Sequence, residues 1–466
     1  MTPVLPTAAI DATAADQLLA EFLRAAAHVP AYRVLLGEHG VRAADVRDVE
    51  TFSRVCPLLS KANTFDRFPL PQLSVGGRLQ DVGEVLTSSG HGGRFSFGVI
   101  SRAEAASSAS FVDAALDAAF SVKSRKTLAV NCLPMGVVVS SQCMTVATTS
   151  VREDMAVALV KAFGEGYEQV VLIGDPLFMK RLTDHATEQG LDWRRYRVNA
   201  VIGEETFGEH FRMYIEGCLG LEPHIPDGGR IMSSFGVGEL GLHLCFETAA
   251  TATLVRNTRA NPALAQRLLG GSRTGSPGSW HPMVLAFDPR RTFIEVVEPD
   301  DEGYGKMAIS MLDPSRQVPL LRYQTGDVVR LLDRDRVAAA LREHGVEIGE
   351  IPAALLALRG RVREALPNGS QVGVYKDALY ANADLARHCT GATRLIFTGD
   401  RFTMHVQLVR GLKPNLALEQ GLLKEIPAEV SPSRLRLWEY AQFPFGMSLD
   451  YERKFQHYVP RDVDPE

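Results

Sequence analysis

The sequence predicts an α/β fold: a large N-terminal domain with mostly parallel sheets covered by helices, and a small, mobile α+β domain at the C-terminus. The 466 residues are enough for two to three domains at roughly 100–200 residues each. From about residue 85 to residue 217, strand-like runs alternate with helical patterns, which is typical of a parallel sheet covered by helices. Near residue 355 this pattern changes. We therefore expect domains at 1–358 and 359–466.

Helix starts and buried strands define the first domain. Four helix starts carry an N-cap signal: Ser101 with Glu104, Ser150 with Glu153, Asp175 with Pro176, and Thr206 with Glu209. The first of these helices has one apolar face, made of Phe111, Val112, Ala115, Leu116, Ala119 and Phe120. Runs at 127–133, 169–174 and 196–203 predict strands. Because ligands of such sheets bind at the carboxyl ends of strands, the loops after these runs are candidate sites.

The C-terminal region contains one clear hairpin signal. Residues 394–397 and 402–409 have strand-like composition, and a Gly399-Asp400 turn lies between them. Gly360-Arg361 precedes this region. A smaller α+β domain is therefore expected after Gly360.

Composition and charge exclude several classes of function. Hydrophobic residues make up 45% and charged residues 23% of the chain, as in ordinary globular proteins. The formal net charge of -5 does not favour nucleic acid or an anionic membrane. The longest apolar stretch, 133–139, is far shorter than the roughly 20 residues of a membrane span. Residues 1–16 do not resemble a signal peptide, so a cytoplasmic location is expected.

The six cysteines form no CxxC motif, which argues against a disulfide framework and against a zinc ribbon. His243 and Cys245 are a close His/Cys pair, and alternate residues of a strand could present both to one metal ion. No second pair with ligand spacing accompanies them, so a buried, structural role is the alternative.

A loop rich in glycine and hydroxyl groups, Leu86 to Arg94, follows an apolar stretch. Its backbone N–H groups could surround a phosphate, since glycine tolerates unusual backbone angles and admits close approach. It is not a Walker A loop. A surface turn is the alternative.

The run Gly236 to Gly241 fits G-x-G-x-x-G and raises the possibility of a dinucleotide site. Such a site also needs an acidic residue about 20 positions later, but no Asp or Glu occurs between Glu247 and Asp288. A dehydrogenase is therefore disfavoured. A further β-like run, 320–327, ends in a Gly-Asp turn that a hairpin corner would also explain.

In their order along the chain, these segments resemble the adenylate-forming superfamily, and within it the phenylacetate–coenzyme A ligase branch. Pro30 to Arg33 and Leu58 to Lys61 are similar to that branch's opening segment. Five further segments match family motifs: Ser89-Gly90-His91-Gly92-Gly93-Arg94, Gly203-Glu204-Glu205, Ser234-Phe235-Gly236-Val237-Gly238-Glu239, Tyr323-Gln324-Thr325-Gly326-Asp327 and Gly360-Arg361. Lys454 occupies the place of the family's C-terminal lysine.

The resemblance implies a site for ATP and Mg²⁺. The residues that it places around the nucleotide are Ser88, Ser89, Gly90, His91, Gly92, Gly93, Arg94, Gly203, Glu204, Glu205, Ser234, Phe235, Gly236, Asp327 and Arg361. Asp327 would hold the ribose. Glu239 would hold the Mg²⁺ ion and would act with Lys454 in catalysis. The acid is expected near Asn131, Pro134, Met135, Gly136, Val237, Gly238 and Leu240.

The sequence departs from the family pattern at several positions. His91 and Gly92 replace two threonines of the phosphate loop, and Gly238 replaces a Ser or Thr. The acidic pair that usually follows Gly360-Arg361 is missing, with only Glu364 nearby, and Lys454 lacks its usual preceding glycine. The replacements at His91, Gly92 and Gly238 remove hydroxyl donors next to the nucleotide. His91 could bind a phosphate oxygen, contact the acid, or have neither role.

The implied function is adenylation of a carboxylic acid, aromatic or otherwise compact, followed by transfer of the acyl group to coenzyme A. The acceptor could instead be an amine or a carrier-protein thiol, since no segment identifies a coenzyme A site. A nucleotide-binding pseudoenzyme is the alternative from another class, motivated by the lost hydroxyl groups. The sequence leaves a homodimer open.

Overall fold

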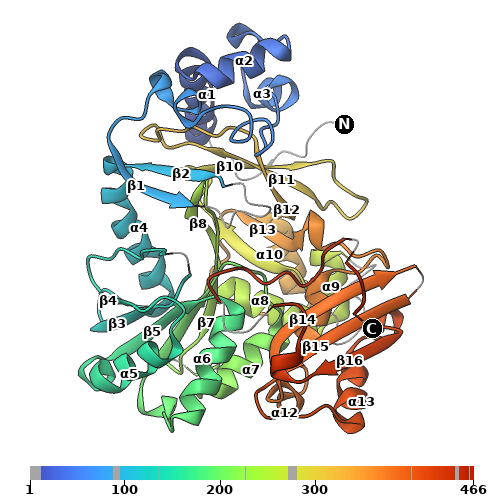
Figure 1. Ribbon diagram of the computed structural model, residues 1–466. Coiled ribbons are helices and arrows are strands. Elements are labelled where there is room, and N and C mark those ends of the chain that lie inside the picture. Colours follow the sequence, from blue (N-terminus) through green and yellow to red (C-terminus); the bar gives the residue numbers. More distant parts are fainter. Residues whose placement is uncertain are drawn as a thin grey trace.

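The computed structural model describes residues 12–87, 95–134, 136–225, 227–270, 281–399, 401–446, 451–460 and 462–465. Within these residues the chain forms an 11-stranded sheet, a three-stranded sheet near the C-terminus and a two-stranded hairpin (Figure 1). The predicted α/β fold, with a large sheet domain and a smaller C-terminal domain, is confirmed.

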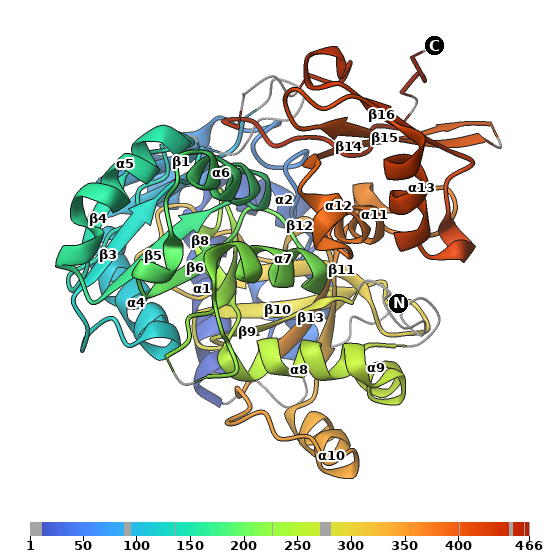
Figure 2. The same ribbon diagram turned by 90° about the horizontal axis from the view of Figure 1, so that it is seen from below.

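Five neighbouring strands of the large sheet run parallel. In sheet order they are β7 (Ile231–Val237), β6 (Val198–Ile202), β5 (Gln169–Gly174), β3 (Thr127–Asn131) and β4 (Thr145–Thr148). Every residue of β3, β5 and β6 is buried, as expected for parallel strands with helices on both faces. The covering helices are α4 (Arg102–Phe120), α5 (Glu153–Phe163), α6 (Pro176–Glu188) and α7 (Glu209–Leu219). Figure 2 shows α5 and α6 on one face and α4 on the other.

The other half of the large sheet is antiparallel, so the prediction of mostly parallel pairing is wrong for this half. Its strands, in sheet order from β7, are β8 (Gly241–Phe246), β9 (Met283–Phe287), β13 (Leu355–Arg361), β12 (Tyr323–Leu332), β11 (Gly305–Met311) and β10 (Thr292–Val297). Short loops join β7 to β8 and β10 to β11, as antiparallel neighbours allow, whereas helices lie in the connections from β8 to β9 and from β12 to β13. The helices of this half are α8 (Ala249–Ala260), α9 (Pro262–Leu269) and α10 (Arg334–Glu343).

Three N-terminal helices pack beside the outer strand β10: α1 (Ala12–His28), α2 (Pro30–Glu38) and α3 (Val49–Val55) (Figure 1). Phe52 of α3 contacts both Phe22 of α1 and Phe293 of β10, with ring centroids 5.8 and 6.3 Å apart. The separate hairpin, β1 (Val82–Thr87) and β2 (Phe97–Ser101), leads into α4.

The C-terminal part contains α11 (Val372–Ala378), α12 (Ala383–Ala386), β14 (Cys389–Thr398), β15 (Arg401–Leu408), α13 (Leu416–Glu425) and β16 (Arg434–Trp438). β14 and β15 are antiparallel, which confirms the predicted hairpin, and β16 adds parallel to β15. Figure 2 shows α11 and α12 between this small sheet and α7.

Two predicted helix caps are confirmed. Ser101 accepts a hydrogen bond from the backbone N of Glu104 at 3.0 Å, and Asp175 accepts one from the backbone N of Phe178 at 3.0 Å. These bonds satisfy donors that the first turn of a helix leaves unpaired.

The other two predicted caps are wrong. Ser150 has a φ of 51° and donates instead to Glu452 Oε1 at 2.8 Å, so that α5 begins at Glu153 without a side-chain cap. Helix α7 begins after Gly208, and Thr206 does not cap it. Asp377 of α11 takes the capping role, since its Oδ1 accepts from the backbone N of Phe211 at 3.0 Å. A carboxylate from a distant segment thus replaces the local cap.

None of the helices within the described ranges has both the length and the apolar composition that a membrane crossing requires.

Candidate functional site

Three cavities meet at the carboxyl ends of β6 and β7, where the large sheet faces the C-terminal part. We call them the central cavity (about 300 Å³), the apolar cavity (about 80 Å³) and the side cavity (about 370 Å³). Glu204 and Gly236 line all three. This is the edge at which an α/β sheet is expected to bind its ligands.

Segments far apart in the sequence line the central cavity. They are Glu204 to Thr206 after β6, Ser233 to Gly236 in β7, Asp327 in β12, Arg361 to Glu364 at the end of β13, and 454–460. Met283, Leu285 and Leu358 add apolar surface. Acidic, basic and apolar walls therefore enclose one space, as a nucleotide with a polar ribose and a flat base requires.

Asp327 offers an unused acceptor in this cavity. Its side chain is buried, Oδ1 lies 3.3 Å from Nε of Arg361, and Oδ2 has no hydrogen-bond partner among the described residues. A buried carboxylate oxygen without a partner is costly, so a ligand hydroxyl at this position would be stabilised. The arrangement fits a ribose hydroxyl.

Lys454 reaches the loop after β6. Its Nζ lies 2.8 Å from Oε2 of Glu204 and donates to the carbonyl oxygen of Glu204 at 2.9 Å. Glu204 has a φ of 70°, a left-handed conformation that is uncommon outside glycine. The loop therefore turns both its carbonyl group and its carboxylate toward the lysine.

Glu205, the next residue, is held by the C-terminal part. Lys376 Nζ lies 2.7 Å from Glu205 Oε2. Burial by itself would raise the pKa of Glu205, but the nearby ammonium of Lys376 outweighs it, and the pKa is about 2. His457 lies 3.9 Å away; burial first, and Lys376 next, lower its pKa to about 3, so the ring is neutral. Glu205 is therefore ionised next to a cation.

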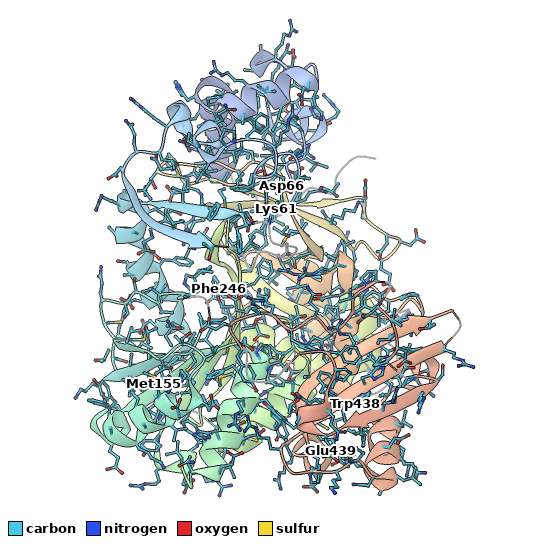
Figure 3. All side chains as sticks on the ribbon, in the orientation of Figure 1. Lys61, Asp66, Met155, Phe246, Trp438 and Glu439 are labelled. Carbon is cyan, nitrogen blue, oxygen red and sulfur yellow. The ribbon has the colours of Figure 1, made fainter. Side chains whose placement is uncertain are left out.

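The side cavity contains Glu239. Its Oε1 accepts hydrogen bonds from Ser96 Oγ at 2.5 Å and from Tyr323 Oη at 3.1 Å, whereas its Oε2 has no partner among the described residues. Mg²⁺ is commonly held by one or two carboxylates together with substrate phosphates. Glu239 fits such a role. Lys61 and Asp66, labelled in Figure 3, line the same cavity.

The apolar cavity lies between α4 and the sheet. The predicted apolar face of α4 forms one wall, with Phe111, Val112, Ala115, Leu116, Ala119 and Phe120. Ile173, Val201 and Met232 line it from the strands, and Phe246, labelled in Figure 3, lines it from the end of β8. Two of the helix residues are alanines, which leave space where larger side chains would fill it.

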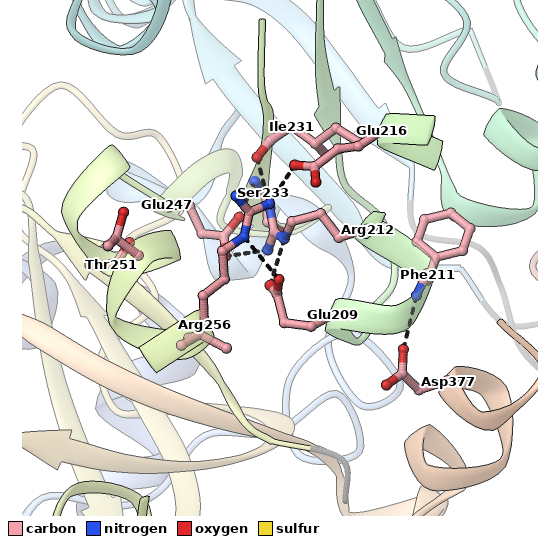
Figure 4. Close-up of polar contacts among 12 residues, drawn as sticks. Glu209, Phe211, Arg212, Glu216, Ile231, Ser233, Glu247, Thr251, Arg256 and Asp377 are labelled. Carbon is pink, nitrogen blue, oxygen red and sulfur yellow. Dashed lines mark hydrogen bonds and ion pairs between the residues drawn. The ribbon is translucent and has the colours of Figure 1, made fainter. Parts of the chain in front are cut away.

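A buried ion-pair network joins α7 to β7 and to Glu247, which lines the apolar cavity (Figure 4). Arg212 of α7 donates to Glu209 Oε1 at 2.6 Å, Glu247 Oε1 at 2.7 Å and the carbonyl oxygen of Ile231 at 2.7 Å. Glu247 Oε2 also accepts from the backbone N of Ser233 at 2.7 Å. Since every charge has a partner, the network fixes β7 relative to α7 without leaving an unpaired charge.

The structure brings together most of the predicted nucleotide residues that lie within the described ranges. Central-cavity residues include Glu204, Glu205, Ser234, Phe235, Gly236, Asp327, Arg361 and Lys454, whereas Gly203 lines the apolar cavity. The predicted phosphate loop (Ser88, Ser89, Gly90, His91, Gly92, Gly93 and Arg94) and Met135 lie outside the described residues. Thr87, directly before the loop, lines the side cavity.

The predicted acid-binding residues do not all line one cavity. Gly136, Val237 and Gly238 line the side cavity, Leu240 is buried behind it, and Pro134 lies near Asp175 and Lys454. Asn131 is buried and donates to the carbonyl oxygen of Val137 at 2.7 Å, so it stabilises its own loop. The apolar cavity uses their neighbours Leu133, Val139 and Leu242 instead.

Two alternatives raised by the sequence have structural explanations. The G-x-G-x-x-G run links β7 to β8 as an antiparallel hairpin, so no helix follows to bind a pyrophosphate. Gly236 is required there because a Cβ would lie 2.5 Å from the backbone of Leu242. His243 and Cys245 lie on β8, but within the described ranges no cluster of three metal-ligating side chains occurs.

Sequence reasoning missed several residues that line or support the cavities. Arg363, His457 and Lys376 carry no motif of their own, and their positions depend on how the C-terminal part docks. Phe111 and Phe120 belong to the predicted apolar face of α4, but that pattern predicts packing against the core and does not predict a cavity. The two alanines in the middle of that face were the available signal of a cavity.

No protein-family model matches the sequence, and no curated protein matches it. Solved structures match in fold. 2-Hydroxyisobutyryl-CoA ligase in the postadenylation state, in complex with 2-HIB-AMP, has a TM-score of 0.67 at 13% identity, over 95% of this chain and 88% of that chain. The same enzyme in complex with 2-HIB-AMP and CoA in the thioesterification state has a TM-score of 0.55 at 13% identity, over 96% and 88%. The chain therefore has the fold of the adenylate-forming CoA ligases.

Proposed function

We propose that this protein is an AMP-forming acid ligase, which uses ATP to adenylate a carboxylic acid and then transfers the acyl group to coenzyme A. One observation carries the proposal. Five distant segments, including Glu204, Asp327, Arg361 and Lys454, meet around one cavity at the carboxyl edge of the sheet. They correspond to the segments whose order along the chain resembles the adenylate-forming superfamily.

In the proposed first step, a carboxylate oxygen of the acid forms a bond to the α-phosphorus of ATP, and the bond to pyrophosphate breaks. Asp327 Oδ2 accepts a hydrogen bond from the ribose and fixes the nucleotide. Lys454 supplies a positive charge where negative charge increases on the phosphate, and such preorganised charge is a large part of many rate enhancements. Mg²⁺ held by Glu239 would neutralise phosphate charge.

In the proposed second step, the sulfur of coenzyme A attacks the acyl carbon and AMP leaves. Lys454 has to withdraw first, so the C-terminal part has to rotate. The two states of 2-hydroxyisobutyryl-CoA ligase support this interpretation. The sequence identity between this chain and that enzyme is 13% in both comparisons. The TM-score is nevertheless 0.67 against the postadenylation state and 0.55 against the thioesterification state. We infer that the present arrangement corresponds to the first half-reaction.

We place the hinge at Gly360-Arg361, the end of β13, and propose that the residues beyond it move as one unit. Gly360 has a φ of 132°, a conformation that other residues rarely adopt. The boundary expected after residue 358 lies inside β13, which pairs with β12 up to Arg361. A hinge at the last two residues of the strand leaves the pairing of Leu355 to Leu358 intact.

We infer that the acid is compact. The apolar cavity of about 80 Å³ is the space next to the nucleotide that can take an apolar body. An apolar protein cavity that holds benzene has roughly 150 Å³. A short, branched acid fits the space directly, whereas an aromatic acid requires Phe111 or a neighbouring side chain to move.

Acid-dependent exchange of pyrophosphate into ATP tests the proposal. The panel should contain acetate, butyrate, isobutyrate, benzoate and phenylacetate, with and without Mg²⁺, followed by thioester detection after addition of coenzyme A. Exchange with at least one acid, and a thioester from the same acid, is expected. Exchange without thioester would assign an amine or a carrier protein as acceptor. ATP binding without any exchange would indicate a pseudoenzyme.

A further inference from the structure

The boundary between the central and the side cavity is rich in cations. The residues that line both cavities are Glu204, Gly236, Arg361, Arg363 and Lys454, and we call this set the junction. Three of its five members are positively charged side chains, and one is acidic. A ligand that extends from one cavity into the other therefore passes two guanidinium groups and one ammonium group.

Two of the three cations of the junction already have a carboxylate partner. Arg361 Nε lies 3.3 Å from Asp327 Oδ1, and Lys454 Nζ lies 2.8 Å from Glu204 Oε2. Arg363 forms no hydrogen bond or ion pair with any of the described residues. The junction thus keeps one positive charge without compensation, and that charge belongs to Arg363.

The two arginines of the junction have different surroundings. The carboxylate of Asp327 raises the pKa of Arg361. The side chain of Arg363 is exposed, yet protein replaces part of its water; this loss first, and the charge of Arg361 next, lower the pKa of Arg363. The adjacent carboxylate of Glu364 accepts a hydrogen bond from the backbone N of Arg361 at 3.2 Å. A bound anion would therefore relieve repulsion at Arg363 that no described side chain relieves.

The roles proposed for the two cavities determine which anion fits. A ribose at Asp327 in the central cavity and Mg²⁺ at Glu239 in the side cavity are the two ends of one ligand, a nucleoside triphosphate with its metal ion. Thr87, the last described residue before the predicted phosphate loop, also lines the side cavity. With the α-phosphate near Lys454, the phosphates beyond it cross the junction toward Glu239.

We propose that Arg363 binds the β- and γ-phosphates of ATP and holds the pyrophosphate as it leaves. This inference rests on the proposed function, since it assumes that ATP occupies the two cavities. As a carboxylate oxygen of the acid bonds to the α-phosphorus, the bond to the bridging oxygen breaks. The electron pair of that bond stays on the bridging oxygen, so negative charge increases on the pyrophosphate. A guanidinium can donate two parallel hydrogen bonds to such a group, which an ammonium cannot.

Ligands with and without the outer phosphates test this inference by titration calorimetry in the presence of Mg²⁺. In Arg363→Ala, the affinities for ATP and for pyrophosphate should fall about tenfold or more, the effect of a lost hydrogen bond between charged groups. The affinity for AMP should stay near the wild-type value, which also shows that the variant is folded. Arg363→Lys, which keeps the charge but not the two parallel donors, should lose less.

The matched control is Arg401→Ala, which removes an exposed arginine of β15 that lines none of the three cavities and should keep all three affinities. In acid-dependent exchange, Arg363→Ala should also raise the KM for pyrophosphate by about tenfold.

The outcomes separate this inference from the proposed function. Unchanged affinities for ATP and pyrophosphate, in a variant that still catalyses exchange, would overturn the inference and leave the adenylation intact. Equal losses for AMP and ATP would overturn it as well, because Arg363 would then contact the part that both ligands share. A selective loss of ATP affinity, in a protein that shows no exchange with any acid, would reject the adenylation and keep the phosphate contact. A wild-type protein that does not bind ATP would overturn both.

Discussion

Lys376 of α11 and Glu205 of the loop after β6 form an ion pair of 2.7 Å, and Lys376 also donates to the carbonyl oxygen of Thr206 at 3.3 Å. Both side chains are largely buried, at 16% and 18% exposure. The pair therefore attaches the C-terminal part to the loop that lines the central cavity. Removing one member leaves the other charge without compensation.

Lys376→Met should destabilise the protein by about 3–5 kcal/mol, the usual cost of breaking a buried pair. The pKa of Glu205 is about 2, below its ordinary value of 4.5, so the pair contributes its full stability above about pH 4.5 and loses it as the pH falls toward 2. Urea unfolding between pH 3 and 7 should show the difference between variant and wild type shrinking at low pH. Lys424→Met, at an exposed position of α13, is the control; a constant difference across this range would contradict the assignment.

Asp175→Asn should stabilise the protein at pH 8. Burial first, and the charges of Glu205 and Glu204 after it, raise the pKa of Asp175 to about 7, although its bond from the backbone N of Phe178 acts in the opposite direction. A raised carboxyl pKa contributes stability below the unfolded value near 3.8 and loses it as the pH rises through 7. Asparagine keeps the cap without the charge.

Thermal unfolding at pH 4 and pH 8 measures this effect. The melting temperature of Asp175→Asn should exceed that of the wild type at pH 8 and approach it at pH 4. Asp48→Asn changes the exposed cap of α3, where Asp48 accepts from the backbone N of Thr51 at 2.7 Å, and should show no such gain. Equal behaviour of the two variants would refute a raised pKa at Asp175.

Asp327→Ala should weaken AMP binding about tenfold or more, because a hydrogen bond to a charged group contributes roughly 1.5–3 kcal/mol. Titration calorimetry with AMP measures the loss, and circular dichroism checks the fold. Asp335→Ala, on the exposed side of α10, is the matched control. Unchanged AMP affinity in a folded Asp327→Ala protein would mean that the ribose does not bind at Asp327.

Lys454→Ala should slow acyl-AMP formation by about 10²–10³, the usual effect of one lost preorganised donor. Transfer from a chemically synthesised acyl-AMP to coenzyme A should stay near the wild-type rate, because the lysine has then left the cavity. Lys413→Ala, at an exposed loop position, should retain both activities. If both half-reactions slow equally in Lys454→Ala, the lysine serves both steps or the variant is misfolded.

Glu239→Gln should raise the Mg²⁺ concentration needed for half-maximal exchange. The amide keeps one acceptor oxygen for Ser96 and Tyr323 but loses the negative charge that a hard cation prefers. Exchange rates over a Mg²⁺ titration provide the measurement. A variant whose Mg²⁺ requirement matches that of the wild type would mean that the metal is held elsewhere.

Local signals predicted the parallel half of the sheet well. Asp175-Pro176 and Ser101 identified helix starts because capping is decided within one turn of chain. The same reasoning failed at Thr206, where Asp377 supplies the cap from another part of the chain. The antiparallel pairing beyond β7 also depends on distant parts of the chain. A short apolar run predicts a strand but not whether the strand next to it in the sheet runs parallel or antiparallel.

The candidate site was predictable to the extent that it consists of motifs. Asp327, Glu239 and Lys454 came from the resemblance, and the structure places them around adjoining cavities. Lys376 could not be predicted, because 171 positions separate it from Glu205 and only docking brings them together. The apolar cavity was hidden for another reason: the volume left by Ala115 and Ala119 depends on how far α4 stands from the strands.

The walls of the central cavity belong partly to the large sheet and partly to residues 454–460. Any small molecule that touches both walls binds the docked arrangement better than the undocked one, so occupancy and docking are thermodynamically linked. A nucleotide in the cavity must then protect the segment around Gly360-Arg361 from proteases. By the same reciprocity, a cross-link that holds the two parts together must increase nucleotide affinity, by at most the factor by which the nucleotide favours docking.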